Sequence, residues 1–93
     1  SDIIVREQDP IVKVELSSDG SLLATACRNG RVSIWDIKAR KRLLSYGGDA
    51  KRINAIAMSP KLPLVSLAEG KSIVIMNIES GKTADIRAGV LQT

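Results

Sequence analysis

The sequence predicts an all-β chain built from two consecutive repeats of four short antiparallel strands. Residues 11–37 align with residues 53–78 at a period of about 42 residues, so that apolar positions meet apolar positions. Each repeat holds short segments in which apolar and polar residues alternate, which is the pattern of a half-buried strand. Turn residues separate these segments, and no segment of the 93-residue chain shows a helical period.

The first repeat accounts for four strands in order. Val12–Leu16 alternates as V-K-V-E-L and is expected to place its apolar side chains on one half-buried face. Leu22–Cys27 is a run of small and apolar residues, which favours a strand covered on both sides. Arg31–Asp36 alternates again, and Lys41–Tyr46 supplies the fourth strand. The turns between the first three strands contain Asp-Gly and Asn-Gly, two pairs that tolerate the positive φ of tight turns.

The second repeat shows the same order of signals. Three strands are expected within Ile53–Ile78 and a fourth in Lys82–Arg87. Asp2–Arg6 is interpreted as a strand left over from a preceding unit. The expected organisation is a leftover strand and linker in residues 1–10, one unit in residues 11–46, and a second unit with a C-terminal tail in residues 47–93.

Four short antiparallel strands that recur at this period are typical of β-propeller blades. The repeats resemble WD40 blades through SSDGSLLATACRNGRVSIWDIKARK in the first and MSPKLPLVSLAEGKSIVIMNIESGK in the second. The resemblance implies two four-stranded blades of an incomplete ring, acting as a non-enzymatic adaptor or scaffold for protein partners. Among the side chains with which this family ties its strands together, Thr25 and Trp35 are present, Asn29 stands where Asp is usual, and His is absent. We expect these three residues to be structural, with the Trp35 indole N–H bonded to a partner.

The segment that joins the repeats is similar to a narrower family, the PROPPINs, which are WD40-like propellers that bind phosphatidylinositol phosphates during autophagy. The similarity rests on Leu43–Pro60, LLSYGGDAKRINAIAMSP, and on GSLLATA in the first repeat. It implies an alternative function as a peripheral membrane module for phosphatidylinositol 3-phosphate or 3,5-bisphosphate. Gly47 and Gly48 stand where that family has paired arginines, so the lipid site is expected to be degenerate. Lys51 and Arg52 are the candidates to replace the missing cations.

The positive charge of the chain is concentrated in one region. The formal net charge is +4 and the sequence pI is about 9.6. Residues 28–52 contain eight basic and two acidic side chains, which suits an acidic peptide, an acidic lipid, nucleic acid, or simply solvated turns. Candidates for contact with a partner are Lys38, Arg40, Lys41 and Arg42. No aromatic residues interleave with them, which argues against single-stranded nucleic acid.

The residue content argues against the common catalytic classes. The chain has no His and a single Cys, Cys27, so it lacks a His general base, a Cys–His pair and an ordinary zinc site. It has no glycine-rich phosphate loop followed by Lys-Ser/Thr. We therefore expect no enzyme activity, no metal and no cofactor. The lone Cys27 favours the cytosol or nucleus, and the charged first residues and short apolar runs show no signal peptide or membrane helix. The expected location is cytoplasmic, peripheral on endomembranes under the PROPPIN interpretation.

Two blades cannot close a ring, and their outermost strands would present unpaired backbone groups. Three hypotheses follow from this. The chain is part of a longer product, several copies assemble into one ring, or the chain completes a propeller supplied by another protein. In each case the expected partners are other protein chains or missing blades.

Overall fold

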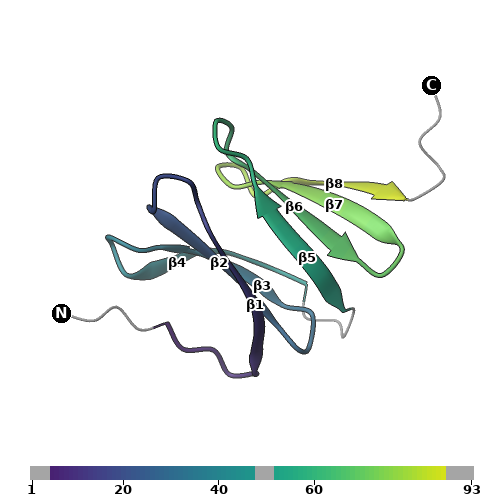
Figure 1. Cartoon of the computed structure of the whole chain (residues 1–93), viewed down its shortest axis with the longest axis horizontal. Coiled ribbons are helices and arrows are strands. Elements are labelled where there is room, and N and C mark those ends of the chain that lie inside the picture. The colour runs from purple at the N-terminus through teal and green to yellow at the C-terminus, as the bar shows by residue number, and fades with distance from the viewer. Residues whose placement is uncertain (1–4, 48–51, 88–93) are drawn as a thin grey trace.

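Two four-stranded antiparallel sheets make up the fold, as Figure 1 shows for the computed structural model, which describes residues 5–47 and 52–87. In spatial order the first sheet contains β1 (Ile11–Leu16), β2 (Leu22–Cys27), β3 (Val32–Asp36) and β4 (Lys41–Tyr46). The second contains β5 (Ile53–Met58), β6 (Leu64–Glu69), β7 (Ser72–Asn77) and β8 (Thr83–Arg87). The described residues contain no helix, and the predicted all-β architecture is confirmed.

The two sheets share one apolar core. In the first sheet Ala24 is paired with Ile34 and Ala26 with Val32, and residues directly opposite each other in neighbouring strands share a face. These four side chains are fully buried and belong to a cluster that continues into the second sheet. The members from the second sheet's inner face are Ile56, Met58, Val65, Leu67, Val74 and Met76. Removal of this apolar surface from water is the main stabilising contribution.

The β1 edge of the first sheet's outer face is apolar and open. Val14 and Leu16 in β1 are 63% and 57% exposed, and Val12, at a bulge in the same strand, is 51% exposed. The expectation that this strand is half-buried is therefore wrong, because alternation shows which face is apolar but not whether another layer covers it. In the repeat, Val14 and Leu16 correspond to Ile56 and Met58, which pack in the core.

The outer face of the second sheet is the repeat counterpart of the first sheet's buried face. Ile73 corresponds to Val32 and Ile75 to Ile34. Ile73 is 43% exposed, whereas Val32 is completely buried. The two outer faces therefore differ from each other. The outer face of the first sheet corresponds in the repeat to the buried face of the second sheet, and the outer face of the second sheet corresponds to the buried face of the first.

The turn between β1 and β2 is closed by a single carboxylate. Asp19 Oδ1 accepts hydrogen bonds from the Ser17 hydroxyl at 2.8 Å, the Ser21 N–H at 3.0 Å and the Ser21 hydroxyl at 2.7 Å. These donors, the Ser21 N–H most of all, lower the pKa of Asp19 from 3.8 to about 2. Gly20 supplies the positive φ of 76° that the turn requires.

The predicted leftover strand, Asp2–Arg6, lies mostly outside the described residues. The part that is described, Val5 and Arg6, is not in a strand. No helix in the described part of the chain is long and apolar enough to cross a membrane.

Candidate partner-binding site

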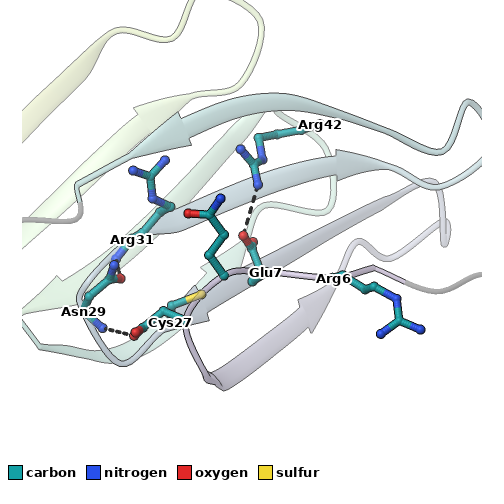
Figure 2. A pocket seen from close by; sticks show the side chains of 8 residues that line it. Arg6, Glu7, Cys27, Asn29, Arg31 and Arg42 are labelled. Carbon is teal, nitrogen blue, oxygen red and sulfur yellow. Dashed lines mark hydrogen bonds and ion pairs between the residues drawn. The ribbon is translucent and has the colours of Figure 1, made fainter.

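A polar network on the outer face of the first sheet joins the segment before β1 to three strands. The Trp35 indole N–H donates to Thr25 Oγ1 at 3.0 Å, and the Thr25 hydroxyl donates to Glu7 Oε2 at 2.8 Å. Arg42 Nη2 donates to Glu7 Oε1 at 3.0 Å, drawn as a dashed line in Figure 2, and its guanidinium lies 4.8 Å from the centre of the Trp35 ring. The Glu7 side chain is only 3% exposed. A buried carboxylate with a cation and a hydroxyl donor thus fixes this segment to the sheet.

A second anchor holds the same segment to the β2–β3 turn. The Asn29 backbone N–H donates to Asp9 Oδ2 at 2.9 Å, and Asn29 Oδ1 accepts the Arg31 backbone N–H at 2.9 Å. Gly30 has a φ of 89°, which this tight turn needs. Residues 7 and 9 therefore connect to the sheet at two separate points.

An open cavity of about 510 Å³ lies between this segment and the first sheet (Figure 2). It is lined by Arg6, Glu7, Gln8, Asp9, Cys27, Asn29, Arg31 and Arg42. The Arg31 side chain is exposed and donates to the Ser45 hydroxyl at 2.9 Å, and among the described residues it forms no ion pair with Glu7 or Asp9. Such a cavity offers a guanidinium to a carbonyl or carboxylate, and carboxylate oxygens to an N–H donor.

Cys27 lies at the buried end of β2 and lines this cavity. Burial raises the pKa of its thiol, and the carboxylates of Glu7 and Asp9 raise that pKa further. The thiol is therefore protonated at neutral pH and is not an activated nucleophile. The described residues also contain no cluster of three or more His, Cys, Asp or Glu that could hold a metal ion.

The four basic residues predicted to contact a partner are divided by the structure. Lys38, Arg40 and Lys41 lie exposed in and beside the β3–β4 turn, where Arg40 has a positive φ of 58°. Arg42 instead points to Glu7, so it positions the N-terminal segment. Sequence reasoning missed Glu7, although the absence of His left Thr25 in need of another partner.

The two residues predicted to bind lipid are only partly described. Lys51 lies outside the described residues, as does Gly48, and Arg52 is exposed immediately before β5. Gly47 has a φ of 78°, and a Cβ added there would lie 2.6 Å from the carbonyl oxygen of Gly30. An arginine at this position would therefore need a shift of the backbone, which explains in physical terms why glycine stands there.

Comparison with curated proteins finds relatives among WD40 proteins. The chain is 36% identical over 72 residues to small ribosomal subunit protein RACK1 of Schizosaccharomyces pombe, covering 77% of this chain and 23% of that protein. It is 36% identical over 69 residues to RACK1 of Caenorhabditis elegans, a match that covers 74% of this chain and 21% of that protein. It is 32% identical over 72 residues to MST50-interacting protein 11 of Pyricularia oryzae, a match that covers 77% of this chain and 22% of that protein. The matches thus span less than a quarter of the length of these relatives. No family model matches the chain.

Solved structures show the same fold. The WD40 domain of SCAP from fission yeast superimposes with a TM-score of 0.79 at 22% identity, covering 94% of this chain and 22% of that one. The Cps50 (Swd1) β-propeller domain of Myceliophteria thermophila gives 0.79 at 22% identity, covering 89% and 26%. The complex of the fission yeast SREBP–SCAP binding domains gives 0.77 at 22% identity, covering 94% and 24%. The chain is a pair of WD40 β-propeller blades and belongs to the WD40-repeat family. The narrower PROPPIN resemblance stays a prediction.

Proposed function

We propose that this chain is a non-enzymatic module that binds protein partners at the end of the first blade where residues 5–10 meet the β2–β3 turn. The observation that carries the proposal is the open cavity of about 510 Å³ described above. Its walls are held by the bonds of Glu7 and Asp9, while the Arg31 guanidinium remains exposed beside it. A wall held at two points, with the exposed guanidiniums of Arg6 and Arg31 beside it, suits recognition of a partner's carbonyl or carboxylate groups.

The relatives support a protein-binding role. One matched structure is a complex of binding domains, and one curated relative is described as an interacting protein. Because these likenesses cover only part of each relative, their particular partners are not transferred to this chain. The exposed Lys38, Arg40 and Lys41 form a second proposed contact, at the opposite end of the blade. A cytoplasmic location and a place in an autophagy-related membrane pathway complete the proposal.

The test is affinity purification of partners with three versions of the chain. Arg31→Glu reverses the charge at the cavity, and Lys61→Glu makes the same change at an exposed site in the β5–β6 turn. Proteins retained by the wild type and Lys61→Glu but lost with Arg31→Glu support the proposal, and calorimetry with each purified protein then gives its affinity. Equal retention by all three versions contradicts it.

A second candidate function, recognition of phosphoinositides, is favoured by the exposed Arg52. Vesicle flotation with and without phosphatidylinositol 3-phosphate tests this candidate, and Lys51→Ala with Arg52→Ala should abolish head-group-dependent binding. Binding that ignores the head group and disappears with salt indicates non-specific charge attraction and refutes it. Gly47→Arg is not a usable gain-of-function variant, because its Cβ would collide with the Gly30 carbonyl.

A further inference from the structure

A second cavity lies between the two blades, on the other side of Cys27. Its volume is about 420 Å³, within the range of ligand-binding pockets. It is lined by Val12 and Lys13 from β1, Cys27 and Arg28 at the end of β2, and Arg52 and Ile53 at the start of β5. Three segments that are distant in sequence meet here because β5 contacts both β1 and β2 (Figure 1).

The backbone beside two of the cations is fixed. The Arg28 N–H donates to the Pro10 carbonyl at 2.9 Å, and the Arg52 carbonyl accepts the Gly70 N–H at 3.3 Å. Both side chains therefore project from anchored positions. A ligand would therefore have to order only the side chains and not the backbone at these two positions.

The charge of this cavity has one sign. Lys13, Arg28 and Arg52 are exposed, and no carboxylate is among the lining residues in the described part of the chain. Within residues 5–47 and 52–87, none of the three forms an ion pair. The carboxylates of Glu7 and Asp9 line the first cavity and are not among the residues that line this one. The Cys27 thiol is neutral, because its pKa is raised, so the positive potential is not offset by the lining.

The rest of the lining is apolar. Cys27 and Ile53 are each 2% exposed and form a buried floor, and the half-exposed Val12 adjoins them. Val12 lies at the register shift between Ile11 and Lys13, so the bulge brings an aliphatic and a cationic side chain together at one place. Inorganic phosphate would use the cations and leave this floor uncovered. A ligand that carries both carboxylates and an aliphatic group would use both parts of the surface.

We propose that this cavity binds an acidic segment of a protein partner, with Lys13, Arg28 and Arg52 pairing with its carboxylates and an aliphatic side chain of the segment lying on Val12 and Ile53. The inference rests on the proposed function as a protein-binding module. It adds a site separate from the Arg31 cavity and names the chemistry of the partner.

The probe is a fluorescein-labelled peptide, Glu-Asp-Leu-Asp-Glu, titrated against the full chain by anisotropy, with Gln-Asn-Leu-Asn-Gln as the uncharged peptide. The test variant combines Lys13→Gln, Arg28→Gln and Arg52→Gln. The matched control combines Lys61→Gln, Lys71→Gln and Lys82→Gln, which removes the same charge from exposed sites in the turns of the second blade that do not line the cavity. Circular dichroism confirms that each variant folds.

We expect the acidic peptide to bind the wild type and the control with similar affinity, and the test variant at least tenfold more weakly. Exchange of Leu for Ser in the peptide should weaken binding several-fold through loss of the contact with the floor. Equal weakening in the test and control variants would overturn the proposal, because it would show that net charge alone attracts the peptide. Vesicles containing phosphatidylinositol 3-phosphate that bind through these three residues, without binding of the peptide, would also overturn it in favour of a lipid.

Two failures are distinguishable. If the wild-type chain does not bind the acidic peptide but still retains protein partners in an Arg31-dependent way, only the assignment of this cavity is refuted. Loss of all Arg31-dependent retention refutes the proposed function itself.

Discussion

Glu7 provides a test of how the N-terminal segment is attached to the first sheet. Glu7→Gln keeps an acceptor for the Thr25 hydroxyl but removes the charge opposite Arg42. Because Arg42 is 39% exposed, solvent screens this pair, and we expect a loss of about 1 kcal/mol in the free energy of unfolding. Glu7→Ala also removes the acceptor and leaves Thr25 poorly satisfied at a buried position, which raises the expected loss to about 2–3 kcal/mol.

The assay is urea unfolding followed by the fluorescence of Trp35, which is the single tryptophan of the chain and a member of the network. Measurements at low and high salt separate the charge contribution, since the difference between wild type and Glu7→Gln should shrink in 1 M NaCl. Glu79→Gln, an exposed carboxylate in the β7–β8 turn, is the control and should change stability by less than about 0.5 kcal/mol. If Glu7→Ala also falls within that limit, the network does not hold the segment and the reasoning fails.

Four further predictions concern single residues. Ser33 Oγ is buried without a hydrogen-bond partner among the described residues, so Ser33→Ala should leave the melting temperature unchanged or raise it, and a clear drop would reveal a missed partner. In chemical denaturation Gly47→Ala should destabilise the chain by about 1–3 kcal/mol more than Gly20→Ala. Both glycines have a positive φ, but only at Gly47 would the added Cβ meet backbone atoms. Equal losses of stability would contradict this contact. The lowered pKa of Asp19 means that its contribution to stability is complete above the unfolded value of 3.8 and is lost as pH falls through about 2; an NMR titration of its carboxyl with a midpoint near 3.8 would disprove the turn's hydrogen bonds. The raised pKa and burial of Cys27 predict very slow reaction with a thiol reagent at pH 8 until urea unfolds the chain, and rapid native labelling would show that the end of β2 opens.

The strands could be predicted from sequence because their signals are local. Leu22–Cys27 and Lys41–Tyr46 have the predicted bounds. The first is a run of small and apolar residues between two turn sequences, and the second begins directly after a turn. The burial of β1 could not be predicted in the same way. Exposure of Val14 depends on whether another layer lies on it, and the pattern within one strand contains no information about that.

The site could be predicted only in part for a related reason. Trp35 and Thr25 are members of a known pattern, but Glu7 meets Arg42 from 35 positions away. The partnership exists because β4 returns beside β3 and the segment before β1 crosses the same face. The basic segment around Lys41 gave no indication that its last arginine would point to a buried carboxylate.

The inequality of the two outer faces gives the blade pair a direction. A neighbour that covers Val14 must present a surface of the kind that Ala24 and Ile34 form, while a neighbour that covers Ile73 must present one like that of Ile56. Two copies related by a twofold axis would set like against like and would match neither requirement. Blade pairs are therefore expected to stack in one orientation only, with the Val14 face of one pair against the Ile73 face of the next. A further blade added in this orientation would form on both of its faces the same kind of contact that joins the two sheets of this chain.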